Sequence, residues 1–139
     1  MSGFSVHTEN GVLNQVFNNT AFTVPGRFLA LFTASTGLEE NLIANAAEVV
    51  SAATGYVRVN ITANGGFTTS SAGTLSNAQE FDFPIATADW QTITHTAVMD
   101  ASAAGTGNVI CWGPLLNPRV IYTGDSIRVP AGAFTITLD

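Results

Sequence analysis

The segment Glu80–Asp139 decides the fold, and it reads EFDFPIATADWQTITHTAVMDASAAGTGNVICWGPLLNPRVIYTGDSIRVPAGAFTITLD. Runs of β-branched and aromatic residues alternate with turn residues about every six to twelve positions, which is typical of successive antiparallel strands. In the run Thr92–Met99, period-two alternation predicts one face with Ile93, His95, Ala97 and Met99. We expect strands near 92–99, 108–113, 119–122, 126–129 and 133–138, with a turn at Pro114–Pro118.

Three upstream stretches extend this pattern. Arg27–Ala34 (RFLALFTA) is nearly apolar on both faces, which predicts a central strand that is covered on both sides. Gly55–Ala63 alternates as a strand does, and Asn64-Gly65 after it predicts a hairpin turn, because both central residues of such a turn need positive φ. Asn41–Ala53 fits either a helical turn or a loop that leads into a strand around Glu48–Val50.

The N-terminal part contains the best helix candidate, Thr8–Asn18. Thr8 can cap the free amides of the first turn, and Glu9 lies near the positive end of the helix dipole. Four apolar residues then recur at helical spacing on one face, namely Val12, Leu13, Val16 and Phe17. We therefore expect an all-β, two-sheet antiparallel sandwich of the jelly-roll kind with one short N-terminal helix.

Length and composition limit the possible functions. A chain of 139 residues fits one domain, which we divide into an arm and helix over 1–19 and a sandwich over 20–139. Only 10% of the residues are charged, against about a quarter in ordinary proteins. A surface so poor in charge suits a subunit that packs against other subunits. Four scattered arginines against ten carboxylates argue against nucleic acid as a partner.

Cysteine usage and hydropathy point to synthesis in the cytoplasm and away from membranes. Cys111 is the only cysteine, so no intramolecular disulfide can form, and its apolar run predicts a buried, inert thiol. We find neither a signal-peptide pattern at the N-terminus nor an apolar run as long as a membrane helix needs.

The sequence offers no constellation of residues for catalysis. His95 lies on an apolar strand face, where a hydrogen-bonded core histidine is the better interpretation than an acid–base catalyst. Glu80 and Asp82 share the outer face of a strand, which favours a solvated edge over a glycosidase pair. One cysteine and two distant histidines do not make a metal site. We expect no enzyme activity, no cofactor and no metal.

Four blocks in the order FPIATADW, THTAVMDA, NVICWG and TGDSIRVPAGAFTITLD carry a resemblance to a known family. They resemble small virion proteins of tailed bacteriophages that are labelled tail-fibre-like or head-decoration proteins. The similarity continues upstream through RFLALFTA and GYVRVNIT and so spans most of the chain. The resemblance implies a structural role in the virion without catalysis.

Within that family we expect a capsid decoration (cement) protein, a homo-trimer that binds the major capsid protein on the outer face of the shell. The alternative is a tail-fibre-like or carbohydrate-binding subunit, for which Trp90 and Tyr56 are the aromatic candidates. The helix face can either attach to a partner or cover an open end of the sandwich. For Trp90 we favour closure of one end of the sandwich over contact with a partner. The candidate partner-binding residues are Phe4, Val6, Val12, Val16, Phe17 and Trp90.

Overall fold

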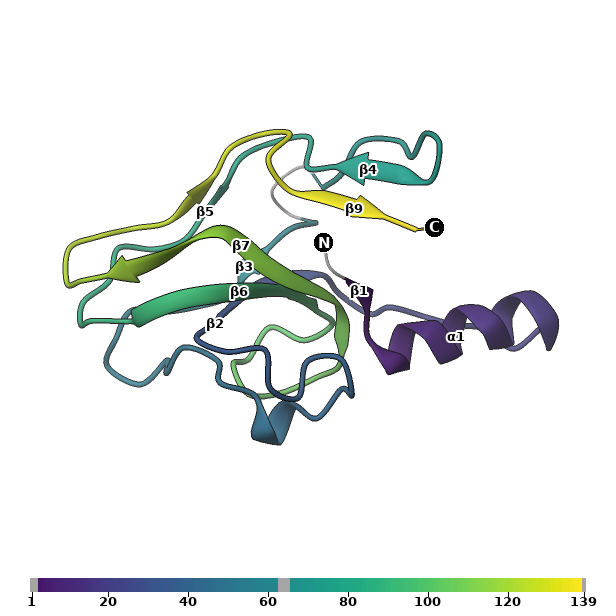
Figure 1. Ribbon diagram of the computed structural model, residues 1–139, viewed down its shortest axis with the longest axis horizontal. Helices are drawn as coiled ribbons and strands as arrows, with labels where there is room; N and C mark the ends of the chain where they lie inside the picture. Colours follow the sequence, from purple (N-terminus) through teal and green to yellow (C-terminus); the bar gives the residue numbers. More distant parts are fainter. Residues whose placement is uncertain (1–2, 63–65, 139) are drawn as a thin grey trace.

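The computed structural model describes residues 3–62 and 66–138, and within them one α-helix accompanies nine strands (Figure 1). In chain order the elements are β1 (Gly3–Phe4), α1 (Val6–Phe17), β2 (Phe28–Phe32), the 3-10 helix η1 (Ile43–Asn45), β3 (Val59–Asn60), β4 (Thr74–Ser76), β5 (Phe81–Asp82), β6 (Gln91–Met99), β7 (Val109–Ile121), β8 (Arg128–Val129) and β9 (Thr135–Thr137). The predicted all-β class, with antiparallel sheets and one short helix near the N-terminus, is confirmed.

One layer is a five-stranded sheet in the order β1-β7-β6-β2-β3, in which every neighbouring pair is antiparallel. The other layer consists of two short ladders, β4 with β9 and β5 with β8. Both ladders join strands that lie far apart in the chain, with Leu75 opposite Ile136 and Phe81 opposite Val129. The C-terminal strands therefore close the sandwich over the sheet (Figure 1).

Strand β2 is buried on both faces, as its apolar sequence predicts. Leu29 and Leu31 point into the main core between the layers. Ala30 and Phe32 point the other way, into a second core that residues of the 38–46 segment cover. Two packed faces explain why a strand with no polar alternation is stable at the centre of the sheet.

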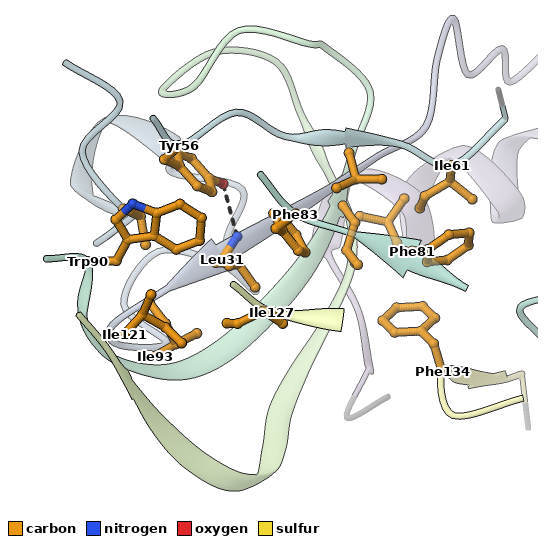
Figure 2. Packing of buried hydrophobic residues seen from close by; sticks show 14 of the residues in the cluster. Leu31, Tyr56, Ile61, Phe81, Phe83, Trp90, Ile93, Ile121, Ile127 and Phe134 are labelled. Carbon is orange, nitrogen blue, oxygen red and sulfur yellow. Dashed lines mark hydrogen bonds between the residues drawn. The ribbon is translucent and has the colours of Figure 1, made fainter. Parts of the chain in front are cut away.

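The main core lies between the sheet and the two ladders and is rich in aromatic rings (Figure 2). Tyr56 stacks on Phe83 with ring centroids 6.3 Å apart and meets Trp90 edge-on at 5.5 Å. Phe67 packs against Phe81 and Phe134. Each such buried ring contributes roughly 1.5–3 kcal/mol relative to an exposed one, so this cluster dominates the stability of the sandwich.

The expected separate strands at 108–113 and 119–122 are one strand, β7, and the predicted turn at Pro114–Pro118 is wrong. Ile93 of β6 pairs with Arg119 while His95 pairs with Pro114, so Thr94 alone faces residues 115–118. The turn residues therefore form an irregularity inside a continuous strand. Among the described strands β1 covers the outer side of β7 only at Cys111 and Trp112, and prolines are tolerated where a strand has a free edge.

The same irregularity corrects the predicted faces of β6. Ile93 belongs to the main core together with Val98, whereas Ala97 and Met99 belong to the second core. The register between β6 and β7 shifts between Ile93 and His95. The alternation of side chains along β6 breaks at the same place, so that Ile93 points to one side of the sheet and Ala97 and Met99 point to the other.

Of the predicted strand Gly55–Ala63, only Val59–Asn60 forms a strand, β3. The expected alternation of buried and exposed side chains is reversed at the start of this segment. Tyr56 and Arg58 are buried, and Val57 is exposed. The hairpin turn predicted at Asn64-Gly65 lies outside the described residues, and Phe67 after it bridges to Asn77. In the undecided segment, η1 forms a helical turn and Glu48 bridges to Phe32.

Candidate interaction surface

The first turn of α1 is fixed to the sheet by hydrogen bonds. Ser5 caps the helix, because its hydroxyl accepts a bond from the Thr8 amide (3.4 Å) and donates to the Val109 carbonyl. The predicted cap at Thr8 is wrong: this residue lies within the first turn of the helix, and its hydroxyl donates to the Ile110 carbonyl (2.8 Å). Glu9 lies in the first turn, as expected.

The segment that follows α1 returns along the helix and packs on Gly11. A Cβ atom at Gly11 would lie 2.4 Å from the Phe22 ring, so only glycine admits this contact. The Phe22 amide donates to the Gln15 side chain (3.0 Å), and the Phe22 ring meets His7 edge-on. A glycine in mid-helix was the only sequence signal of this packing.

The opposite face of α1 carries exposed apolar side chains. Leu13, Val16 and Phe17 are 54%, 65% and 77% exposed, and Val6 at the start of the helix is also exposed. At 100° per residue, Glu9 falls on this same face. We call Val6, Glu9, Leu13, Val16 and Phe17 the outer face of α1. The helix extends away from the two layers (Figure 1).

The remaining candidates from the sequence lie elsewhere. Val12 is half-buried on the flank of the helix, and Phe4 packs from β1 against the main core. Trp90 is only 2% exposed, and its indole nitrogen donates to the Thr54 carbonyl (2.9 Å). Its assignment as a partner-binding residue is thereby corrected: the ring packs inside the chain. Tyr56 is buried as well, so the two aromatic candidates for a sugar platform are inaccessible.

An apolar groove opens beside α1, between β1 and β7 on one side and the β4–β9 ladder on the other. Its volume is about 350 Å³, and Phe4 and Ile110 line the sheet side. The opposite wall contains Leu75, Ile136 and Leu138. We call this cavity the end groove.

The end groove and the outer face of α1 each carry one charged group. Arg27 is the charged residue among those that line the groove. Within residues 3–62 and 66–138, no ion pair or hydrogen bond engages the side chain of Arg27 or that of Glu9. Both side chains therefore remain available to another molecule.

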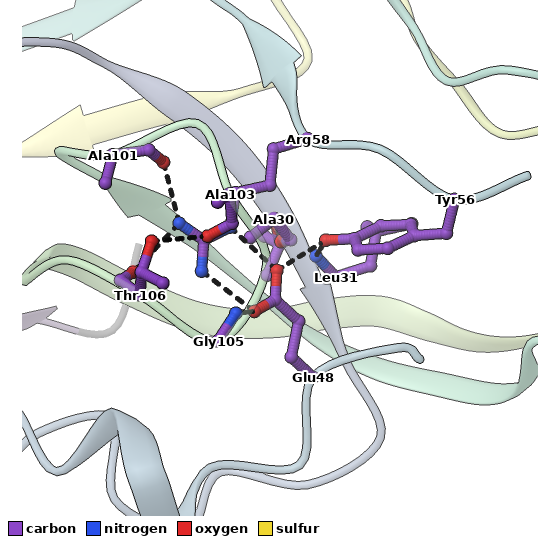
Figure 3. A network of polar contacts seen from close by, with 10 residues as sticks. Ala30, Leu31, Glu48, Tyr56, Arg58, Ala101, Ala103, Gly105 and Thr106 are labelled. Atoms are coloured by element: carbon purple, nitrogen blue, oxygen red, sulfur yellow. Dashed lines mark hydrogen bonds and ion pairs between the residues drawn. The ribbon is translucent and has the colours of Figure 1, made fainter. Parts of the chain in front are cut away.

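The most site-like polar cluster of the chain is a buried network around Glu48 (Figure 3). The fully buried Arg58 side chain donates twice to the Glu48 carboxylate, both at 2.8 Å. Its remaining nitrogen donates to the carbonyls of Ala101 (2.7 Å) and Thr106 (3.0 Å). The Glu48 carboxylate also accepts from the Tyr56 hydroxyl (2.9 Å) and from a backbone amide of the 101–106 loop.

This network holds the chain together and presents no reactive group. The Tyr56 hydroxyl accepts a bond from the Leu31 amide (3.0 Å) in addition to its bond with Glu48. Burial raises the pKa of Tyr56 far above its usual range, and the neighbouring Glu48 carboxylate adds to this rise. The phenol therefore stays protonated and locked between two strands. Local sequence patterns do not predict this pair, because the residues that enclose it come from distant parts of the chain.

The other candidate reactive groups also have structural places. His95 is half-buried, with Nδ1 2.7 Å from the Thr94 hydroxyl and its ring tilted on Trp112. Cys111 is a buried free thiol, as predicted, and burial raises its pKa to about 12. Glu80 and Asp82 lie on the outer face of the β5–β8 ladder, where Asp82 accepts from Arg128 (2.7 Å).

Within the described residues, no group of three or more His, Cys, Asp or Glu side chains is placed to hold a metal ion. The helices in those residues are too short or too polar to cross a bilayer.

Comparison with known proteins identifies the family. The family model described as podophage GP4 fiber I protein gp80 matches residues 3–137. No curated protein gives a significant match. The matched region includes β1, α1 and every later strand described above. The chain therefore belongs to the family of podophage GP4 fiber I protein gp80, whose members are tail-fibre-like structural proteins of the phage virion.

Proposed function

We propose that this protein is a non-enzymatic structural subunit of a phage tail fibre and that it functions as a homo-trimer. The observation that carries the proposal is the family match over residues 3–137, whose description names a fibre protein. The structure adds two supporting features. The polar network around Glu48 is satisfied within the chain, and the outer face of α1 leaves apolar groups exposed.

Self-association follows from the same features. A subunit in which only 10% of the residues are charged has few charged groups to remove from water when it packs against copies of itself. Closed rotational assemblies are the common form of such oligomers. Light scattering of the purified protein tests this part: we expect a trimer, and a strict monomer at all concentrations would contradict it.

Capsid decoration, the location expected from the sequence, is the alternative to this proposal, and one experiment separates it from the fibre location. Gold-labelled antibody against the protein is applied to intact virions, and the rupture temperature of heads is recorded with and without the protein. We expect label on the tail, and heads lacking the protein should rupture at the normal temperature. Label spread over the shell, together with fragile heads, would support a cement protein instead.

A further inference from the structure

We infer that the outer face of α1 in one copy docks into the end groove of a second copy, with Glu9 of the helix facing Arg27 of the groove. This inference rests on the self-association proposed above and is independent of where in the virion the protein lies. The partner is thus a second copy of this chain, and both halves of the contact are present in each subunit.

The first argument is the match in polarity. An amphipathic helix that lies in an apolar groove is a common mode of protein recognition, with anchor residues spaced three, four and seven apart. Val6, Leu13 and Phe17 follow that spacing along α1. The groove offers Leu75, Ile136 and other apolar side chains in a cavity of about 350 Å³. That volume is enough to admit a large side chain such as that of Phe17.

The second argument is charge. Each surface is mainly apolar and carries one charged residue, and the two charges have opposite signs: Glu9 on the helix and Arg27 at the groove. No described residue of the same chain engages either side chain. Opposite charges at an interface fix its register and exclude other arrangements, even where they add little affinity.

The third argument is area. Removing the exposed parts of Val6, Leu13, Val16 and Phe17 from water buries on the order of 400 Å² on the helix. The groove itself contributes a smaller area, most of it apolar. Each helix–groove contact alone is therefore smaller than a standard interface. A closed ring compensates for this, because every subunit takes part in two such contacts.

The geometry of the contact also limits the symmetry. Helix and groove are different surfaces, so the contact is heterologous and repeats around a ring until the ring closes. The trimer proposed above is the expected closed form. Two copies that exchange helices reciprocally are the competing form, which the experiment below distinguishes.

Charge reversal tests the contact, because Glu9 and Arg27 are both exposed and their substitution leaves the fold intact. In the variants Glu9→Arg and Arg27→Glu, like charges meet, and we expect association to weaken by about tenfold or more. The double variant carries the swapped pair and should regain the wild-type oligomer. Arg119→Glu on β7, an exposed arginine away from the groove, is the matched control and should associate normally.

Mixing the two single variants sharpens the result. The E9R helix fits the R27E groove, and the unchanged helix of the R27E protein fits the unchanged groove of the E9R protein. Every helix in the mixture thus needs a groove of the other variant, so the two variants must alternate around a ring. Such alternation is possible only in assemblies with an even number of subunits. If the wild type is a trimer, the mixture should form dimers or tetramers and not trimers. A mixture that forms trimers as well as the wild type does would overturn the pairing.

An apolar pair of variants provides the second test. Phe17→Ser should weaken association by roughly ten- to a hundredfold, since a buried aromatic side chain contributes about 1.5–3 kcal/mol. Leu116→Ser, at a side chain 97% exposed on β7, is its control and should have no effect.

The outcomes separate this inference from the proposed function. A wild-type protein that is monomeric at all concentrations defeats both the trimer and the contact. A wild-type oligomer that tolerates E9R, R27E and F17S keeps the trimer and overturns the contact. Loss of association in L116S would overturn the contact and show that the interface between copies lies on β7.

Discussion

The chain contains two glutamate–arginine combinations that differ in almost every respect. Glu48 and Arg58 are buried, joined by two hydrogen bonds of 2.8 Å, and surrounded by further donors and acceptors of the same chain. Glu9 and Arg27 are exposed and belong to separate surfaces, where no described residue of the chain engages them. The first combination completes a fold, and the second leaves two surfaces incomplete.

The apolar residues divide in the same way. Trp90 is enclosed by the main core and bonded through its indole nitrogen, whereas Phe17, an aromatic residue on the helix, is 77% exposed. Buried groups with partners in the same chain contribute to the stability of one subunit, whereas a patch of exposed apolar side chains indicates contact with another molecule. Each prediction below breaks one side of this comparison and leaves the other intact.

The largest effect is expected from breaking the buried pair. Arg58→Met removes three donors and leaves the Glu48 carboxylate buried beside the 101–106 loop. An uncompensated buried charge costs about 3–5 kcal/mol of unfolding free energy. Urea unfolding followed by tryptophan fluorescence measures the loss. Arg119→Met, at an exposed arginine away from the groove, is the matched control and should change the free energy by less than about 0.5 kcal/mol.

A double variant shows whether the lone charge is the cause. Glu48→Gln combined with Arg58→Met removes the buried charge and keeps one acceptor oxygen, which can serve either the Tyr56 hydroxyl or the Gly105 amide. We expect the double variant to be more stable than Arg58→Met alone. Equal stabilities of the two proteins would instead assign the cost to packing.

The next effect concerns alkaline pH. Burial raises the pKa of Cys111 to about 12, while a thiol in the unfolded chain titrates near 8.5. Its contribution is therefore complete below about pH 8.5 and is lost as the pH rises toward 12. At about pH 10.5 the loss amounts to roughly 2–3 kcal/mol. Urea unfolding at about pH 7.5 and about pH 10.5 measures this difference.

Two variants assign the alkaline effect to its groups. Cys111→Ala removes the thiol, and we expect the fall in stability between the two pH values to shrink accordingly. The buried phenol of Tyr56 acts in the same direction, because its pKa is also raised by burial, and Tyr56→Phe removes that part. An undiminished fall in both variants would contradict this assignment.

Much of the fold follows from local sequence patterns. Phe28–Phe32 is apolar at every position, which suits a strand covered on both sides, and β2 occupies that place. The helix, the buried Cys111 and the outer position of Glu80 and Asp82 follow from spacing in the same way. Each of these depends on neighbours within a few residues.

The wrong predictions all depend on tertiary neighbours. Pro114 and Pro118 signal a turn in isolation, yet they are tolerated within β7 because that part of the strand has a free side. Ser5 and Thr8 are both suitable caps, and the sheet selects Ser5 through its bond to Val109. The burial of Arg58 likewise depends on residues 101–106, which fold over it.

The candidate surface was only half predictable. Helical spacing indicated an apolar face on α1, and Val16 and Phe17 lie on it. The end groove could not be found in the same way, because its walls come from β1, β4, β7 and β9 and from the segment around Arg27. A cavity assembled from such distant segments has no local signature, so the complement of the helix became visible only in the folded chain.

The smallest effect on the stability of the single subunit is expected on the outer face of α1. Valine and serine have similar helix propensities, and Val16 is 65% exposed. Val16→Ser should therefore change the unfolding free energy of the monomer by less than about 0.5 kcal/mol. The same substitution at Val98, buried in the main core, should cost more than about 2 kcal/mol, because it leaves a cavity and buries a hydroxyl.

Protein concentration provides the decisive variable, since docking to a second copy raises the melting temperature by mass action. The wild type should melt higher as its concentration rises, and Val16→Ser should show a weaker dependence. A large loss of stability in dilute Val16→Ser would mean that this helix face already packs within its own subunit.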